Sequence, residues 1–156
     1  MSEAKEFSPE VIVHPVFLTR KEADGINRLL KQLSDFATEL SARKLEYIIN
    51  QSNFRLVILK DPRSDEVIGM ASLVINLDLM RTTGFVSSVV VDERYRGKKL
   101  GELLVKYLIA MARNKEVVYL SLTSNPKREA ANALYIKLGF LLIGQVADSN
   151  YYRLYL

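Results

Sequence analysis

Hydrophobic residues recur along the chain with two periods, one typical of strands and one typical of helices. Runs rich in β-branched and aromatic residues predict strands at residues 11–18, 54–59, 67–75, 85–91, 117–122, 140–146 and 150–155. Apolar residues spaced three or four apart predict helices at residues 20–33, 38–51, 100–111 and 126–138. The order β-α-α-β-β-β-α-β-α-β-β predicts an α/β fold in which about four helices flank one mixed β-sheet.

Local signals support several of these boundaries. Thr19 and Glu22 have the spacing of a capping box, in which each side chain bonds the backbone amide of the other residue. Asn125-Pro126 predicts the start of the last helix, and Gly139 predicts its end. The three consecutive valines at 89–91 indicate either a strand buried on both faces or a β-bulge.

The length of the chain fits one domain. It has 156 residues, of which 49% are hydrophobic and 26% charged, and no repeat or flexible linker interrupts it. We expect a loose N-terminal arm at residues 1–9 and a single domain at residues 10–156. The polar N-terminus lacks the apolar run of a secretory signal, and no segment reaches the roughly 18 apolar residues of a membrane span. These features predict a cytoplasmic protein with no membrane partner.

Composition restricts the available chemistry. The chain has no cysteine, which excludes thiol nucleophiles, and a single histidine, His14, which we interpret as structural. We therefore expect no metal site. The net charge is +4, but the cations that lie close together are few, so we also expect no nucleic-acid partner. They are Arg94, Arg96, Lys98 and Lys99.

Residues 92–101 carry the first functional signal. A strand ends here and a helix begins, and the N-terminus of a helix offers unpaired amides and partial positive charge to an anion. Gly97 and Gly101 allow close approach of the backbone. The segment lacks the patterns GxxxxGK[ST] and GxGxxG of other nucleotide-binding folds. It predicts a phosphate-containing ligand, with a solvated basic turn before an ordinary helix as the alternative.

A second motif follows after one strand. Residues 89–101, VVVDERYRGKKLG, and residues 128–140, REAANALYIKLGF, together resemble the acetyl-CoA-binding region of the GNAT superfamily of N-acetyltransferases. The specific motifs lie within residues 86–140, and residues 1–80 match in the order of elements alone. The resemblance implies a GNAT fold that moves an acetyl group from acetyl-CoA, its co-substrate, to a primary amine by direct attack in a ternary complex.

The resemblance also implies which residues bind the cofactor. The diphosphate loop of the family falls on Arg96, Gly97, Lys98, Lys99, Leu100 and Gly101. Lys99 replaces the first glycine of the motif. We expect helical dihedral angles there, which suit lysine, with its side chain pointing away or reaching a phosphate.

Further roles follow from the same resemblance. The backbone of Val89, Val90 and Val91 is expected to bind pantetheine and polarise the thioester carbonyl, while the side chains pack in the core. Tyr135 matches the tyrosine beside the CoA sulfur and is expected to be catalytic, because a phenol can protonate a leaving thiolate. The alternative is a packing role in the core. Asn132 lies one turn earlier on the same helix face and is expected to contact the pantetheine arm.

The acceptor side of the site is less defined. Arg128 stands where many relatives have asparagine, and it faces a cofactor phosphate, an acidic acceptor or solvent. The general base is either water-mediated or absent, since none of the candidate carboxylates stands out: Asp78, Glu93, Glu129 and Asp148. The C-terminal tyrosines at 151, 152 and 155 are either strand aromatics or part of an acceptor pocket.

The prediction is therefore an enzyme whose acceptor is a small-molecule or peptide amine. Many relatives are dimers, and the final strands offer an interface for a homodimer. The alternative function is a non-catalytic acyl-CoA-binding or interaction module on the same fold, supported by Lys99 in the glycine position and by the lack of an evident base.

Overall fold

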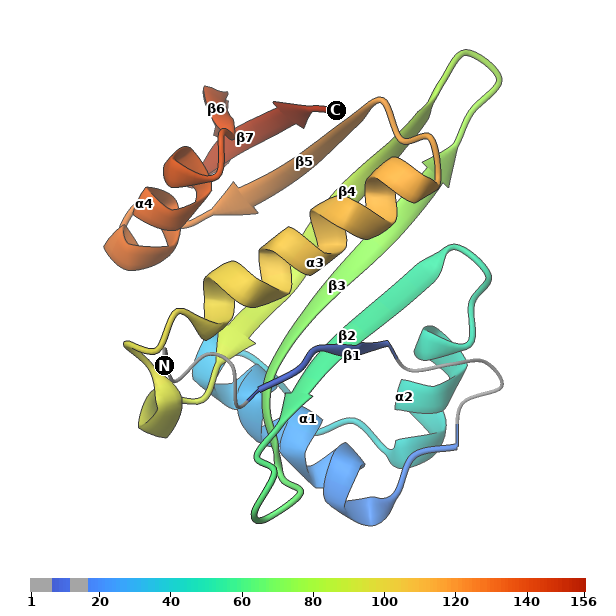
Figure 1. Cartoon of the computed structure of the whole chain (residues 1–156), viewed down its shortest axis with the longest axis vertical. Helices are drawn as coiled ribbons and strands as arrows, with labels where there is room; N and C mark the ends of the chain where they lie inside the picture. Colours follow the sequence, from blue (N-terminus) through green and yellow to red (C-terminus); the bar gives the residue numbers. More distant parts are fainter. Residues whose placement is uncertain (1–6, 12–16) are drawn as a thin grey trace.

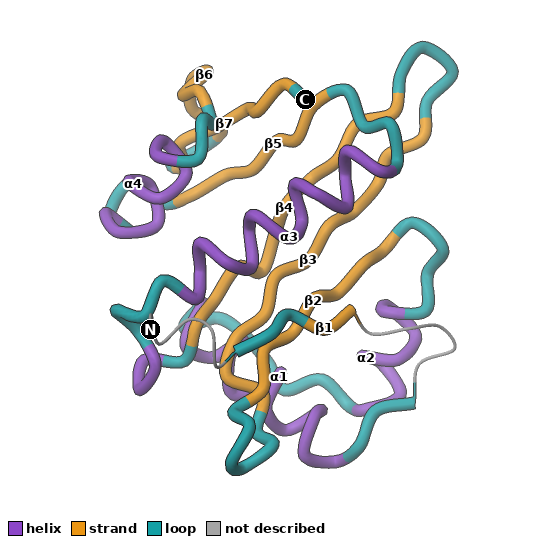
Figure 2. Tube along the Cα trace, viewed as in Figure 1, coloured by secondary structure: helices purple, strands orange, loops and turns teal. Residues whose placement is uncertain are grey.

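The structure is a computed structural model that describes residues 7–11 and 17–156 (Figure 1). Its elements follow the predicted order, with one short 3-10 helix added, and Figure 2 shows how they alternate along the chain. They are β1 (Glu10–Val11), α1 (Arg20–Leu33), α2 (Ala42–Ile49), β2 (Phe54–Lys60), β3 (Val67–Leu77), β4 (Thr82–Val91), η2 (Glu93–Tyr95), α3 (Leu100–Asn114), β5 (Tyr119–Ser124), α4 (Glu129–Lys137), β6 (Leu141–Val146) and β7 (Ser149–Tyr155).

The strands form one seven-stranded sheet in the order β1-β2-β3-β4-β5-β7-β6. Neighbouring strands are antiparallel except β4 and β5, which are parallel. Their register consists of Gly84 opposite Leu120 and Phe85 opposite Ser121. Beyond these pairs the two strands draw apart (Figure 1). The predicted α/β fold with one mixed sheet is confirmed, and the point of separation positions the site described below.

Helices cover both faces of the sheet, which explains the long apolar runs of its central strands. Along β2, Val57 and Leu59 share a core with α3, whereas Leu56 and Ile58 share a core with α1 and α2. A strand buried on both faces has a continuous hydrophobic sequence rather than an alternating one. In the part of the chain that the structure describes, no helix has the length and apolar character of a membrane span.

The predicted capping box at the start of α1 is confirmed. Thr19 Oγ1 accepts a hydrogen bond from the Glu22 amide at 3.1 Å, and the Thr19 amide donates to Glu22 Oε1 at 3.0 Å. Two amides at the end of the helix thereby gain partners that the helix itself cannot supply. Lys60 of β2 lies 3.5 Å from the Glu22 carboxylate and links the cap to the sheet.

The start of α4 differs from the prediction. The helix begins at Glu129 rather than at Pro126, because Asn125 forms a turn of its own. Asn125 Oδ1 accepts from the Lys127 amide at 2.9 Å, and its carbonyl accepts from the Arg128 amide at 3.0 Å. Such local side-chain bonds compete with helix formation and delay it.

The N-terminal segment also differs. β1 is a short edge strand, and residues 12–16, which include His14, lie outside the described residues, so the interpretation of His14 stays a prediction. Phe7, which we expected in a loose arm, is 6% exposed and packs edge-to-face on Tyr95, with ring centroids 6.2 Å apart. The prediction of a loose arm is therefore wrong at Phe7, because this ring is part of the core.

Candidate active site

A β-bulge shapes the backbone of β4 where the strands separate. Ala71 of β3 stands opposite two residues of β4, Ser88 and Val89, and Ser88 has a left-handed φ of 53°. A bulge bends its strand and leaves backbone groups unpaired. Both interpretations of the three valines hold, because Val89 is buried in the core beneath α3 and Val90 in the core beneath α1.

A cleft of about 770 Å³ lies beside this bulge. Its walls come from the end of β4, the turn that leads into α3, and α4. It brings together most of the predicted cofactor residues, namely Val89, Val90, Val91, Arg96, Gly97, Lys99, Leu100, Gly101 and Tyr135. Lys98 and Asn132 do not line it.

A smaller cavity of about 210 Å³ adjoins the cleft between the separated strands. Its walls include residues 85–89 of β4 and residues 122–123 of β5. We call the place where the cleft and this cavity meet the junction. Its residues line both spaces and are Leu33, Val89, Arg128 and Tyr135.

The turn at residues 96–101 has the geometry of an anion-binding segment. No side chain caps the start of α3, so its first amides remain available to a ligand. Gly97 has φ 81°, and a Cβ added there would meet no atom within 4 Å, so the surrounding space is open. A Cβ on Gly101 would lie 3.5 Å from the Leu134 side chain of α4, which is ordinary contact.

Lys99 does not have the helical dihedral angles that we expected. Its φ of 60° and ψ of 25° place it in the left-handed region, as the residue immediately before α3. This conformation costs a residue with a Cβ about 1 kcal/mol or more, and glycine escapes the cost. A left-handed backbone at this position favours glycine, which is the residue of the family pattern. Lys99 adopts this conformation with strain.

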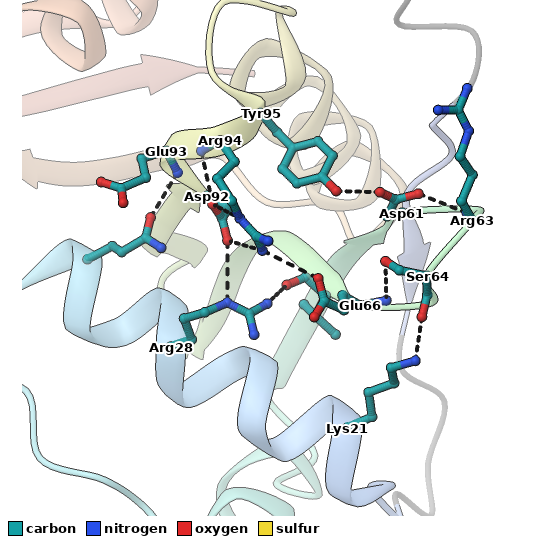
Figure 3. A network of polar contacts seen from close by, with 12 residues as sticks. Lys21, Arg28, Asp61, Arg63, Ser64, Glu66, Asp92, Glu93, Arg94 and Tyr95 are labelled. Carbon is teal, nitrogen blue, oxygen red and sulfur yellow. Dashed lines mark hydrogen bonds and ion pairs between the residues drawn. The ribbon is translucent and has the colours of Figure 1, made fainter.

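Asp92 holds the start of this turn through a network that the motifs did not reveal (Figure 3). Its side chain is 1% exposed and accepts hydrogen bonds from Arg94 Nε at 3.1 Å, from the Arg94 amide at 3.0 Å and from Arg28 Nε at 3.3 Å. The hydrogen bonds from Arg94 lower the pKa of Asp92 to about 2, against the opposing effect of burial. Arg28 also donates to the Val67 carbonyl at 2.9 Å, which ties the turn to α1 and β3.

Two further hydrogen bonds in Figure 3 hold the residues that follow Asp92 in place. The Glu93 amide donates to Gln32 Oε1 of α1 at 2.9 Å, and the Tyr95 hydroxyl donates a short hydrogen bond to Asp61. The bond to Asp61 raises the pKa of Tyr95 and lowers that of Asp61. Arg94 forms ion pairs with Asp92 and Glu66, so its charge is balanced within the protein and is not directed at a ligand.

An acidic residue joins the two helices that flank the cleft. Glu102 of α3 accepts from Lys137 of α4 at 2.9 Å and from Lys106 at 3.0 Å. The hydrogen bonds from Lys137 and then Lys106 lower the pKa of Glu102 to about 2. Because both lysines engage this carboxylate, it lines the cleft without adding an unpaired negative charge.

Tyr135 packs in the core and also lines the cleft and the smaller cavity, and its catalytic role stays a prediction. It is 3% exposed, and its ring contacts Phe140 and Tyr152 at centroid distances of 5.8 Å and 6.0 Å. No hydrogen bond to its hydroxyl is seen among the described residues, and Tyr135 is one of the residues of the junction. Burial raises the pKa of Tyr135, while the charge of Arg128 lowers it. The net effect keeps a phenol, which is a proton donor, at neutral pH.

Asn132 has a different role from the pantetheine contact that we predicted. Its Nδ2 donates to the carbonyls of Asn125 at 2.9 Å and Arg128 at 2.7 Å. Its Oδ1 accepts from the Tyr152 hydroxyl at 2.7 Å and from Asn150 at 3.3 Å. Asn132 is 9% exposed, and both atoms of its amide are hydrogen-bonded within the protein, so it fixes α4 to β7.

Arg128 lines both the cleft and the smaller cavity. It is half-buried at the junction, and its Nη2 donates to the Val89 carbonyl at 3.3 Å. The three roles offered by the sequence, toward a cofactor phosphate, an acidic acceptor or solvent, stay predictions.

The remaining candidates lie elsewhere or stay open. Of the possible bases, Glu129 lines the cleft, whereas Asp78, Glu93 and Asp148 line neither space. The C-terminal tyrosines also line neither space; two of them surround Arg153, which stacks on Tyr119 at 4.2 Å. In the described part of the chain, no three His, Cys, Asp or Glu side chains gather closely enough to hold a metal ion.

The profile of the acetyltransferase (GNAT) family matches residues 25–140. The chain belongs to the GNAT acetyltransferase family. A Drosophila melanogaster protein named as a probable glucosamine 6-phosphate N-acetyltransferase is 29% identical over 157 residues. That match covers 92% of this chain and 66% of the relative, so the chain spans somewhat less than two thirds of that GNAT protein.

Solved structures share this fold. An acetyltransferase of Trypanosoma brucei superposes with a TM-score of 0.74 at 25% identity, over 90% of this chain and 96% of that one. A chain of the NatC complex bound to Gag peptide and CoA gives a TM-score of 0.73 at 18% identity, over 97% and 99%. The resemblance of residues 89–101 and 128–140 to GNAT motifs therefore identified the family correctly.

We expect Asp92→Asn to lower the free energy of unfolding by about 2 kcal/mol at pH 7, because it weakens several charge-assisted hydrogen bonds. The lowered pKa of Asp92, about 2, means that this stabilisation is complete above its ordinary pKa of 3.8 and is lost as the pH falls toward 2. Urea unfolding at pH 7 and near pH 2.5 measures both effects. Asp65→Asn, at an exposed turn, is the matched control, and equal stability of the two variants at pH 7 would contradict the role of Asp92.

Two substitutions separate backbone strain at Lys99 from its side chain. Lys99→Gly and Lys99→Ala both remove the ammonium, but alanine keeps the left-handed strain and glycine relieves it. We expect the glycine variant to be the more stable by about 1 kcal/mol in urea unfolding. An alanine variant as stable as the glycine variant would show that the turn relaxes out of the left-handed region.

Proposed function

We propose that this GNAT protein transfers an acetyl group from acetyl-CoA to a primary amine by direct attack in a ternary complex. The observation that carries the proposal is the junction. The cleft extends from the turn at residues 96–101 to the junction, where Val89 of the bulged strand and Tyr135 line both the cleft and the smaller cavity. The thioester and the amine need such a meeting point with access from two sides.

The residues of the cleft fit acetyl-CoA. The amides at residues 99–101 and the positive end of α3 suit a diphosphate. The bulged backbone at residues 89–91 leads from that turn to the junction and suits the amide groups of pantetheine. The volume of about 770 Å³ lies in the range usual for ligand sites, roughly 300–1,000 Å³. The CoA in the related NatC structure supports this choice of co-substrate.

The reaction needs a nucleophile, an oxyanion site and a proton for the leaving group. The lone pair of the amine forms a bond to the thioester carbon, and the C=O electrons move to oxygen, where backbone donors of β4 stabilise the charge. The carbonyl then re-forms, the C–S bond breaks, and its electron pair leaves on sulfur. Tyr135 gives its proton to sulfur and regains one from solvent, while the nitrogen loses one. The products are an amide and free CoA.

We further propose that the acceptor is a small-molecule amine. The second cavity is only about 210 Å³, which suits a compact substrate better than an extended peptide. The name of the Drosophila relative, which refers to a phosphorylated amino sugar, supports the same class. A peptide amine is the other class that we predicted from the sequence, and an acceptor screen separates the two.

A cytoplasmic location, and the absence of metal, nucleic-acid and membrane partners, stay predictions. The alternative function, a non-catalytic acyl-CoA-binding module, shares the cleft but requires no acceptor. The strain at Lys99 and the lack of an evident base are compatible with it. Turnover with any amine would exclude this alternative.

The first test is thermal unfolding with and without acetyl-CoA, with ATP as the control nucleotide. A ligand at 100 times its dissociation constant adds about 2.7 kcal/mol of stability, so a clear rise in Tm specific to CoA species is expected. Thiol release with a panel of small amines and N-terminal peptides then measures transfer. No shift in Tm at millimolar acetyl-CoA would overturn the proposal.

Tyr135→Phe tests the role of the hydroxyl. We expect kcat to fall by about 100-fold with little change in acetyl-CoA affinity, because a proton donor is lost and the ring is kept. Tyr47→Phe, on the exposed surface of α2, is the matched control and should keep full activity. Unchanged turnover in Tyr135→Phe would remove this residue from the mechanism.

We also propose that two copies pair through the edge strand β6. Leu141, Leu142, Ile143 and Val146 are each about half exposed, and the strand contains no charge that would oppose pairing. A dimeric mass is expected in analytical ultracentrifugation, and Ile143→Lys should yield monomers. Leu79→Lys, in the exposed β3–β4 turn, should stay dimeric. A monomeric wild-type protein at all concentrations would contradict the pairing.

A further inference from the structure

Arg128 occupies an unusual position for a cation. It precedes the first turn of α4, and its guanidinium lies at the junction rather than over the phosphate-binding turn. Its recorded partner is neutral, the carbonyl of Val89, at 3.3 Å. This distance is at the long end for a hydrogen bond, so the contact is weak and easily exchanged for another.

Four of the other cations near the site have an ion pair or a hydrogen bond within the protein, while Lys99 and Lys127 also line the cleft. Arg94 and Arg28 pair with Asp92, and Lys137 pairs with Glu102. Arg96 donates to the Val91 carbonyl at 3.1 Å. Among the described residues, no carboxylate forms an ion pair with Arg128. Its positive charge is therefore available to a ligand bound at the junction.

The geometry of the cleft places the sulfur of the substrate at this point. The diphosphate belongs at the turn, and the pantetheine arm follows the backbone of residues 89–91 away from it. The thioester at the far end of that arm must then lie at the junction, between Val89, Arg128 and Tyr135. This step rests on the proposed function.

We propose that Arg128 is a catalytic cation that stabilises the thiolate of CoA as the C–S bond breaks. The electron pair of that bond goes to sulfur, and the guanidinium lowers the energy of the resulting negative charge until Tyr135 delivers its proton. A positive charge within a few ångströms of a developing anion acts strongly where water is partly excluded.

The behaviour of Tyr135 supports this placement. Burial raises the pKa of Tyr135, and the charge of Arg128 opposes that rise, so its field reaches the phenolic oxygen. The same field makes the phenol a better donor and the thiol a better leaving group. Arg128 thereby assists C–S cleavage, and its effect on Tyr135 offsets the lower basicity of the stabilised thiolate.

Other titratable groups lie around the junction and contribute to its electrostatic potential. On α4 these are Glu129 and Lys137, and Lys127 lies just before the helix; Glu102 lies on α3 and Tyr152 on β7. The turn adds Tyr95, Arg96 and Lys99. These groups are unchanged in the variants below, so the comparison isolates Arg128.

The test measures the pKa of the CoA thiol in the complex, from the ultraviolet absorbance of the thiolate during a pH titration. In the wild-type complex we expect this pKa to be about one unit or more below that of free CoA, as is usual beside an opposite charge. Arg128→Met should abolish the shift, and Arg128→Lys should keep part of it. Arg113→Met, at the exposed far end of α3, is the matched control and should behave as wild type.

Kinetics provide a second readout. We expect Arg128→Met to lower kcat by about 100-fold with little change in the KM for acetyl-CoA, because the charge acts on the transition state. Unfolding of each variant without CoA checks that the fold is intact, and Arg128→Lys retains a cation should the Met variant unfold.

The outcomes are distinguishable. If wild type binds no CoA, the proposed function fails and this inference fails with it. If CoA binds but its thiol pKa is the same in wild type, Arg128→Met and Arg113→Met, the inference alone is overturned. A variant that retains kcat but raises the KM of an anionic amine would instead assign Arg128 to the acceptor.

Discussion

The separation of β4 from β5 is the constraint on which the rest of the site depends. The two strands share a ladder at Gly84 and Phe85, and beyond it β5 no longer pairs with β4. Backbone polar groups in a protein interior need partners, so an opening of this kind within a sheet is costly unless water or a ligand occupies it. The bulge at Ser88 turns this feature into a binding surface, because it directs the unpaired groups into the cleft.

Electrostatics then hold the turn beside that opening. Asp92 is buried and would be unfavourable as an isolated charge, but two arginines from different elements satisfy it. Because Arg28 belongs to α1 and Arg94 to the turn, the carboxylate joins the two sides of the sheet at the entrance of the cleft. The loop can therefore present free amides without being flexible itself.

Much of the fold could be predicted from the sequence, because hydrophobic periodicity and the Thr19–Glu22 cap are local signals. The placement of residues 89–91, 96–97, 99–101 and Tyr135 around one space also followed from the two family motifs. The wrong predictions concern residues whose conformation depends on backbone angles or distant contacts, which a local pattern does not show. Lys99 adopts a left-handed backbone conformation that its residue type does not predict. Asn125 forms a turn where a helix was expected.

Long-range partners were the other source of error. Asn132 has its amide fully used by residues that include Asn150 and Tyr152 of β7, and nothing near it in the sequence reveals this. The salt bridge between Arg28 and Asp92 spans 64 positions and was equally invisible. Both are contacts between elements, which a single sequence read in short windows cannot supply.

The bonds of Asn132 have a mechanical consequence. Through Tyr152 and Asn150 they fasten α4, the helix that carries Tyr135 and follows directly on Arg128, to the C-terminal hairpin of β6 and β7. Tyr152 also contacts the ring of Tyr135, so hairpin and helix form one rigid unit behind the junction. A substitution that loosens the β6–β7 hairpin is therefore expected to shift Tyr135 as well, although the two lie on different elements.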